Sequence, residues 1–401
     1  MEKQKNIPKL RFYAFKEEWG MKKLGEVATI NPSNKTLPDK FIYIDLESVS
    51  NGILLKENLI SKTEAPSRAQ RILKENDVLF QMVRPYQMNN LFFNKIGDFV
   101  ASTGYAQIRT LQNPMYIFQY LHFQKFVDKV IERSTGTSYP SINSSDLSNI
   151  TISFPSLPEQ IKIASFLSSV DKKNSQLKQK KILLEQYKKG VMQKIFSQEL
   201  RFKDENGKDF PEWQTKKFEK IFKRVTTKNI ENNDNVLTIS AQHGLINQQD
   251  FFNKSVSAND VTGYYLIKKG DFAYNKSYSK GYPMGAIKPL KKYEKGVVST
   301  LYICFNLIDN SNPDFYEHYF ESGKINKQIH KIAQEGARNH GLLNLSVVEF
   351  FKDIDILEPH IKEQEKIASF LNEISKQISF ISEQLEETRK FKKGLLQNMF
   401  I

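Results

Sequence analysis

The chain has 401 residues, a length that predicts two or more domains. Of these residues 39% are hydrophobic and 12% aromatic, a composition that excludes a disordered chain. Its 59 Lys and Arg against 45 Asp and Glu give a formal net charge of +14, so a polyanionic partner such as nucleic acid is the first expectation. No run of about 18 apolar residues predicts a membrane span, and the single cysteine, Cys304, excludes an internal disulfide and favours the cytoplasm.

The chain repeats itself as two units of about 200 residues, a period well above that of solenoid repeats. The matching blocks are LRF at 10–12 and 200–202, EW at 18–19 and 212–213, residues 72–80 and 266–274, and residues 160–196 and 364–400. The last block aligns without a gap. We therefore interpret the chain as a tandem duplication.

Each unit begins with short segments rich in β-branched and aromatic residues, bounded by Asn, Gly and Pro. They are FIYIDL (41–46), DVLFQMV (77–83) and ITISF (150–154) in the first unit, and NVLTIS (235–240) and VVSTLYICF (297–305) in the second. Residues 116–133 and 315–334 are predicted to be helical. The pattern predicts mixed, sheet-containing globular domains at 1–155 and 198–357.

Each unit ends in a predicted long helix, at 156–197 and 358–401. Apolar residues recur every seven positions, at Ile163, Val170, Leu177, Leu184 and Val191, and Ile367, Ile374, Ile381 and Leu395 keep this register in the second copy. A sustained heptad indicates a coiled coil, although an amphipathic helix lying on its own domain is an alternative. The predicted fold class is α+β, with two mixed domains separated by a pair of long antiparallel coiled-coil helices and related by a pseudo-two-fold duplication.

The sequence lacks the usual signatures of an enzyme that modifies DNA. Neither a dinucleotide-binding glycine loop nor a phosphate-binding loop occurs, no Glu-x-Lys triplet occurs, and the six histidines lack metal-binding spacing. We predict no catalytic and no metal-binding residue. Two alternatives stay open at this point: a DNA methyltransferase or nuclease with a degenerate catalytic motif, and a structural coiled-coil protein that binds a membrane through its charge.

Two units that open with LRF…EW…KKL and close on P-x-x-x-EQ-x-x-IASFL…KKG resemble the specificity (S) subunit of type I restriction-modification systems. The segment GTSYPSINSSDL (136–147) adds to this resemblance. It implies a non-catalytic subunit whose domains, 1–155 and 198–357, are target-recognition domains for the two halves of a split DNA sequence, with helices as the spacer. It also implies two methyltransferase (M) and two restriction/translocase (R) subunits as partners. S-adenosylmethionine, ATP and Mg are expected on those partners, and no cofactor in this chain.

Candidate DNA-binding residues lie in polar loops, where donors and acceptors could reach base edges or phosphates. In the first domain they are Arg68, Gln70, Arg71, Arg84, Tyr86, Gln87, Asn89, Ser138 and Tyr139, and in the second they are Lys276, Tyr278, Lys280, Tyr282, Arg338, Asn339 and His340. Arg84 and Arg338 are the strongest candidates, because a guanidinium group can bind guanine or phosphate through two hydrogen bonds. The loops differ between the repeats while the scaffold blocks match, so we expect the domains to read different half-sites.

Overall fold

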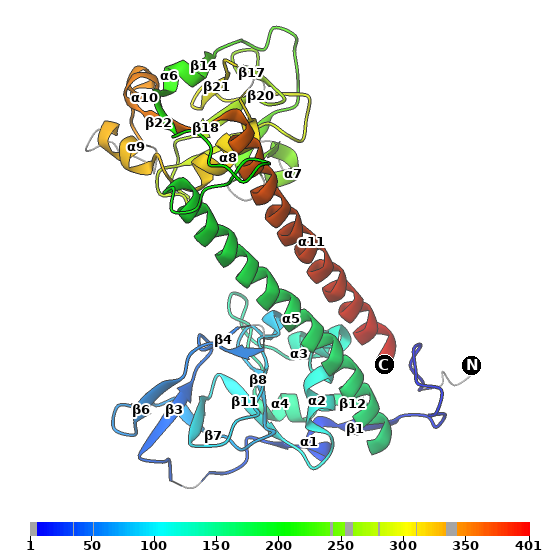
Figure 1. Cartoon of the computed structure of the whole chain (residues 1–401). Coiled ribbons are helices and arrows are strands. Elements are labelled where there is room, and N and C mark those ends of the chain that lie inside the picture. The colour runs from blue at the N-terminus through cyan, green and yellow to red at the C-terminus, as the bar shows by residue number, and fades with distance from the viewer. Residues whose placement is uncertain are drawn as a thin grey trace. The chain divides into compact units, whose positions relative to one another are not determined.

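The structure is a computed structural model of the chain, and it describes residues 6–34, 36–50, 52–240, 244–252, 260–279, 281–309, 311–333 and 343–401. The chain forms two compact units (Figure 1). Unit 1 contains residues 1–179 and 382–401, and unit 2 contains residues 180–381. Each unit therefore combines one sheet-containing domain with parts of both long helices.

Unit 1 contains two four-stranded sheets, with strand orders β6-β3-β10-β7 and β2-β11-β8-β9, and two two-stranded sheets, β1-β12 and β4-β5. Its strands are β1 (Gly20–Lys23), β2 (Thr29–Ile30), β3 (Lys40–Ile44), β4 (Val49–Ser50), β5 (Ile53–Leu54), β6 (Asn58–Ser61), β7 (Ala69–Ile72), β8 (Val78–Gln81), β9 (Leu91–Phe92), β10 (Phe99–Ser102), β11 (Tyr105–Arg109) and β12 (Thr151–Phe154). Its short helices are α1 (Leu24–Val27), the 3-10 helix η1 (Pro85–Gln87), α2 (Pro114–Tyr120), α3 (Gln124–Glu132) and α4 (Ser144–Ser148).

Unit 2 contains one four-stranded sheet, β14-β21-β18-β19, and three two-stranded sheets, β13-β22, β15-β16 and β17-β20. Its strands are β13 (Gln214–Lys217), β14 (Phe222–Val225), β15 (Leu237–Ser240), β16 (Gly244–Asn247), β17 (Tyr265–Lys268), β18 (Phe272–Asn275), β19 (Ala286–Pro289), β20 (Lys295–Val298), β21 (Ile303–Leu307) and β22 (Asp355–Glu358). Its short helices are α6 (Phe218–Ile221), α7 (Gln248–Phe252), α8 (Pro313–Glu321), α9 (Asn326–Ile332) and α10 (Val347–Asp353).

The two units share a topology. The sheet β2-β11-β8-β9 of unit 1 matches β14-β21-β18-β19 of unit 2, and the pair β1-β12 matches β13-β22. Even the single parallel pairing of unit 1, between β3 and β10, has a counterpart in a parallel bridge between Val236 and Val297. The duplication inferred from sequence blocks is therefore also a duplication of fold.

The two long helices are α5 (Leu157–Phe196) and α11 (Ile361–Met399). In unit 1 the final turns of α11 share a core with the first turns of α5, and Lys392 lies 2.6 Å from Asp171. In unit 2 the final turns of α5 share a core with the first turns of α11. Within each unit the helices are therefore antiparallel, and heptad residues such as Leu177 and Ile381 are buried. The predicted fold class is confirmed.

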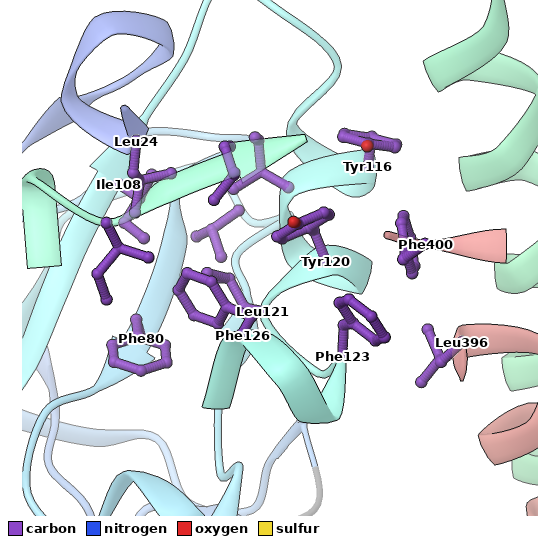
Figure 2. Packing of buried hydrophobic residues seen from close by; sticks show 14 of the residues in the cluster. Leu24, Phe80, Ile108, Tyr116, Tyr120, Leu121, Phe123, Phe126, Leu396 and Phe400 are labelled. Atoms are coloured by element: carbon purple, nitrogen blue, oxygen red, sulfur yellow. The ribbon is translucent and has the colours of Figure 1, made fainter. Parts of the chain in front are cut away.

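The final aromatic residue of each repeat block lies inside a domain core. In unit 1 the Phe400 ring faces Tyr116, Tyr120 and Phe123, with ring centroids 5.5, 5.1 and 5.8 Å away (Figure 2). In unit 2, at the aligned position, Phe196 packs against Trp213, Phe315 and Tyr319 at 6.4, 5.8 and 5.4 Å. Each domain core is thus completed by the helix end of the other repeat.

An ion pair explains why the LRF and EQ motifs occur in both repeats. In unit 1 Arg11 Nε lies 2.7 Å from Glu159 Oε1, and in unit 2 Arg201 Nη2 lies 3.0 Å from Glu363 Oε2. Both carboxylates are buried, and hydrogen bonds with them raise the pKa of both arginines. Trp213 adds a third contact, because its Nε1 donates to Glu363 Oε2 at 3.0 Å. The motifs therefore fasten the start of each domain to the start of its helix.

The glutamine of each EQ motif holds the same junction from the other side. Gln160 Nε2 donates to the Pro155 carbonyl at 2.9 Å, and Gln364 Nε2 donates to the Pro359 carbonyl at 3.0 Å. The amide oxygen of Gln364 accepts from the backbone N–H of Asn312 at 3.0 Å. Because both glutamines are buried, these hydrogen bonds satisfy groups that would otherwise be costly to desolvate.

The segment before each domain leaves the preceding helix in the same way. In unit 2 the Leu200 N–H donates to the Lys194 carbonyl at 3.1 Å, just after α5 ends. In unit 1 the Leu10 N–H donates to the Asn398 carbonyl at 2.8 Å, at the end of α11. Asn398 and Lys194 occupy aligned positions in the repeat. In unit 2 the helix end and the segment after it are consecutive in the chain. In unit 1 the equivalent helix end and segment are far apart in sequence, and the same hydrogen bond joins them.

Candidate nucleic-acid interface

The loop after β8, residues 82–90, carries four of the predicted DNA-binding residues. Arg84 and Met88 have left-handed backbones, with φ of 54° and 51°, which side chains other than glycine adopt at a cost. Gln81 holds the loop, because its Nε2 donates to the Val83 carbonyl at 2.7 Å and to Gln87 Oε1 at 2.9 Å. The loop is therefore a fixed structure that η1 and buried hydrogen bonds define.

A second predicted loop, residues 134–141, joins the first. Val83 forms a β-bridge with Ser141, and the Arg84 N–H donates to the Pro140 carbonyl at 2.7 Å. The guanidinium carbon of Arg84 lies 4.2 Å from the centre of the Tyr139 ring, while 63% of Tyr139 is exposed. This cation–π contact preorganises the guanidinium beside an aromatic surface, an arrangement suited to base edges or phosphates.

A further group of predicted residues, Arg68, Gln70 and Arg71, lies on or next to β7. The turn between β10 and β11 connects this group to the loop after β8. The Thr103 N–H donates to the Arg68 carbonyl, and the Met82 N–H donates to the Gly104 carbonyl, both at 2.9 Å. Arg68 and Gln70 are exposed. Arg71 is half-buried, and its Nε finds no hydrogen-bond partner among the described residues.

Burial lowers the pKa of Arg71, because the charged group loses hydration there. Its Nε is itself shielded from solvent, so an anion at the surface would contact this side chain only after the side chain moved.

In unit 2 the loop between β18 and β19 carries Lys276, Tyr278 and Tyr282. The Leu343 N–H donates to the Lys276 carbonyl at 3.1 Å, so this loop also meets the segment before the next short helix, as in unit 1. Tyr278 is 66% exposed, and burial lowers the pKa of Lys276. The predicted residues Lys280, Arg338, Asn339 and His340 lie outside the described residues.

The structure assigns different surroundings to the remaining predicted residues of unit 1. Tyr86, Gln87 and Ser138 are exposed beside Arg84 and Tyr139. Asn89 is turned inward. Its Nδ2 donates to the Val49 carbonyl at 2.7 Å, and its buried Oδ1 has no partner among the described residues. That placement suits a residue that shapes the loop, a role that the amino-acid type alone did not reveal.

Sequence analysis missed two residues that lie behind these loops, His122 in unit 1 and Glu321 in unit 2. His122 Nδ1 lies 2.8 Å from the Phe118 carbonyl, and the ring lies near the backbone of Met88 in the loop after β8. Each residue lies nine positions after the asparagine that caps its helix, Asn113 or Asn312. That common spacing was the available signal, although the two residue types differ.

The lowered pKa of His122 should make the stability of unit 1 depend on pH. Burial, with a smaller contribution from Lys392, lowers its pKa from 6.5 to about 4. The His122 imidazole therefore binds a proton below about pH 6.5 in the unfolded chain, but only below about pH 4 in the folded chain. The free energy of unfolding should fall by about 2–3 kcal/mol across this window.

Urea unfolding between pH 7 and pH 4 would measure the effect, with His122→Gln as the comparison. The variant should lose this part of the pH dependence and keep the part due to carboxylates. Equal slopes in the two proteins would contradict the assignment.

Within the described part of the chain, no three His, Cys, Asp or Glu side chains gather in a way that could hold a metal ion. The helices described there are all too short or too polar to cross a bilayer.

Comparisons with known proteins agree with this architecture. Residues 16–186 match the type I restriction modification DNA specificity domain. The HindI specificity subunit of Haemophilus influenzae is 25% identical over 147 residues, which are 34% of this chain and 32% of the relative. The MjaVIII specificity subunit of Methanocaldococcus jannaschii is 24% identical over 233 residues, 55% of this chain and 52% of the relative. The matches thus span about half the length of these relatives or less.

Two solved structures share the fold over nearly the whole chain. The S subunit of a type I system from M. genitalium has a TM-score of 0.58 at 15% identity, covering 98% of this chain and 99% of its own. A chain solved in work on complex assembly and conformational transition of the type I R-M system has a TM-score of 0.56 at 18% identity, with coverages of 95% and 97%. The resemblance drawn from the sequence is therefore confirmed: residues 16–186 match the model of the type I restriction modification DNA specificity domain, and the fold is similar to that of solved S subunits.

Proposed function

We propose that this chain is a non-catalytic DNA-recognition subunit that reads a bipartite target with an unread gap. The observation that carries the proposal is the pair of related domains whose scaffold matches while the polar loops differ. The loop after β8 carries Arg84, packed on Tyr139, whereas the equivalent loop after β18 carries Lys276 and Tyr278. Different side chains on equivalent loops would present different donors and acceptors to DNA.

The long helices support a target with a gap of fixed length. The 40 residues of α5 are about 60 Å long at about 1.5 Å per residue. B-DNA of that length contains about 18 base pairs at 3.4 Å each. Helices of this length suit a subunit whose two recognition surfaces engage separate half-sites.

The proposed partners are double-stranded DNA, two M subunits and two R subunits, in the cytoplasm. The net charge of +14 favours DNA, since Lys and Arg release counterions from the phosphate backbone. In this proposal S-adenosylmethionine, ATP and Mg belong to the partner subunits. The chain would supply the sequence specificity and the scaffold on which the other subunits assemble.

The experiment that tests the proposal is sequencing of methylated genome motifs in cells with and without this chain. We expect one two-part motif that disappears when the chain is deleted. In parallel, the purified chain with DNA and S-adenosylmethionine should transfer no methyl group. Methyl transfer by the chain alone would favour the degenerate-enzyme alternative, and a motif without a gap would contradict the bipartite reading.

Arg84 provides the sharpest test of the proposed interface in unit 1. Replacing it with alanine should weaken binding to the preferred duplex by about tenfold to a hundredfold, since a bidentate base contact contributes about 1–3 kcal/mol. Arg133 is the control, because it is exposed in α3's C-terminal turn and bonds only to the Lys129 carbonyl of its own helix. Fluorescence anisotropy at one salt concentration would measure both variants, and equal affinities would contradict a role for Arg84.

A further inference from the structure

The positions of His122 and Glu321 are equivalent in the repeat, and each residue lies between a long helix and a recognition loop. The lysines that face them, Lys392 and Lys188, are the first residues of the two KKG motifs and are also equivalent. The structure therefore contains the same three-part arrangement twice: a helix lysine, a residue at or just after the end of α2 or α8, and the loop that follows β8 or β18.

In unit 2 the arrangement is a chain of ionic contacts centred on Glu321. Lys188 Nζ of α5 lies 3.0 Å from Glu321 Oε2, and Lys288 Nζ of β19 lies 3.7 Å from Glu321 Oε1. Lys288 Nζ in turn lies 5.8 Å from the centre of the Tyr282 ring. The side chains of Lys188 and Lys288 are only 15% and 7% exposed, so these charges interact with little screening.

Residues of this loop line a small cavity. Glu321, Tyr282 and the glycines Gly281 and Gly285 line this cavity of about 30 Å³. Both glycines have left-handed backbones, with φ of 87° and 75°. A loop with two such residues over a void needs contacts from outside to keep one conformation. The Glu321 carboxylate supplies them through Lys288.

The charges of this chain of contacts depend on one another. Burial alone would raise the pKa of Glu321, but contacts with His318 and with the ammonium groups of Lys288 and Lys188 lower it well below its usual range. Without that negative charge two largely buried cations would face the same space and repel each other. Lys288 would then leave its position over Tyr282.

In unit 1 the corresponding contacts are fewer, but they reach the equivalent loop, the one after β8. The ring of His122 lies near the backbone of Met88, four residues after Arg84. Lys392 of α11 is near enough to disfavour the charged imidazole, and it is held by Asp171 at 2.6 Å. Gln119 Nε2 donates to the same carboxylate at 2.7 Å, so the helix pair and the domain meet beside His122.

We infer that Glu321 and His122 are positioning residues, each holding the recognition loop of its own unit in place through contacts with a long helix. This inference rests on the proposed function, since it assigns a task to residues behind the DNA-reading loops. Neither residue is offered as a DNA contact. Glu321 instead links Lys188 to the loop at Tyr282, and His122 links the region of Lys392 to the loop at Met88.

The test measures binding of the full-length chain to three duplexes: the preferred target and two versions with one half-site scrambled. The proteins are wild type, Glu321→Gln, Glu321→Asp and His122→Gln. Glu321→Gln should reduce the preference for the unit 2 half-site by about tenfold and leave the other half-site unchanged. His122→Gln should do the reverse. Glu321→Asp keeps the charge and should restore part of the preference.

Lys188 and its neighbour give a matched control within one helix. Lys188→Met should reproduce the effect of Glu321→Gln, and the double variant should be no worse than either single variant, because both break one set of contacts. Lys189 is exposed in α5, so Lys189→Met should not change the preference between half-sites. Any loss of discrimination by Lys189→Met equal to that of Lys188→Met would contradict the inference.

The remaining outcomes separate this inference from the proposed function. Equal loss at both half-sites in Glu321→Gln would indicate general destabilisation and overturn the positioning role. Unchanged discrimination in both Glu321→Gln and His122→Gln would overturn it too. A wild-type chain that prefers no duplex would contradict the proposed function itself, and the inference with it.

Discussion

Replacing Phe196 with alanine should lower the free energy of unfolding of unit 2 by about 3–5 kcal/mol. The ring is 2% exposed and contacts Trp213, Phe315 and Tyr319, so its removal leaves a cavity among aromatic side chains that cannot close easily. Urea unfolding followed by Trp213 fluorescence, in a Trp19→Phe background, would report this unit separately.

The matched control is Phe391 of α11, which is 55% exposed. Phe391→Ala should change the free energy of unfolding by no more than about 0.5 kcal/mol, as is usual for surface positions. Comparable losses in the two variants would show that the end of α5 is not part of the core of unit 2.

Replacing Glu363 with glutamine should lower the free energy of unfolding of unit 2 by about 3 kcal/mol. The carboxylate is fully buried and receives hydrogen bonds from Arg201 and Trp213, so the substitution removes the buried counter-charge of Arg201 and leaves only the exposed carboxylate of Glu212 beside it. Glu365→Gln is the control, because Glu365 is exposed two residues later in the same helix.

Differential scanning fluorimetry would compare the two variants directly. A large fall in Tm for Glu363→Gln with little change for Glu365→Gln would support the ion pair as the fastening between domain and helix. Similar Tm values for both variants would contradict it, and would leave the LRF and EQ motifs without a structural explanation.

The fold could be predicted well because two strong signals agree. Heptad spacing from Ile163 to Val191 requires a partner helix, and the gapless match of 160–196 to 364–400 identifies that partner within the chain. Aligning the two repeats also distinguishes scaffold residues, which match, from loop residues, which differ. Residues such as Trp19 and Trp213 keep their places because they fill cores, while the loops around Arg84 and Lys276 diverge.

The candidate interface was harder to predict, because side-chain type does not determine direction. Asn89 has the same donor and acceptor groups as an exposed asparagine, yet its amide is committed to the Val49 carbonyl. His122 and Glu321 are different residue types at one position, so no motif connects them. Their common role follows only from the packing of helix lysines against the domains, which joins residues more than a hundred positions apart.

The exchange of helix ends between the repeats has a consequence for how the polypeptide reaches its native state. Neither repeat contains its complete core, since Phe400 fills the first domain and Phe196 fills the second. Ribosomal synthesis of the first repeat thus yields a folding intermediate with an open aromatic site, which closes only when the last residues have been made. Two nascent copies could fill each other's sites at that stage, so the same contacts that complete the monomer also provide a route to swapped oligomers.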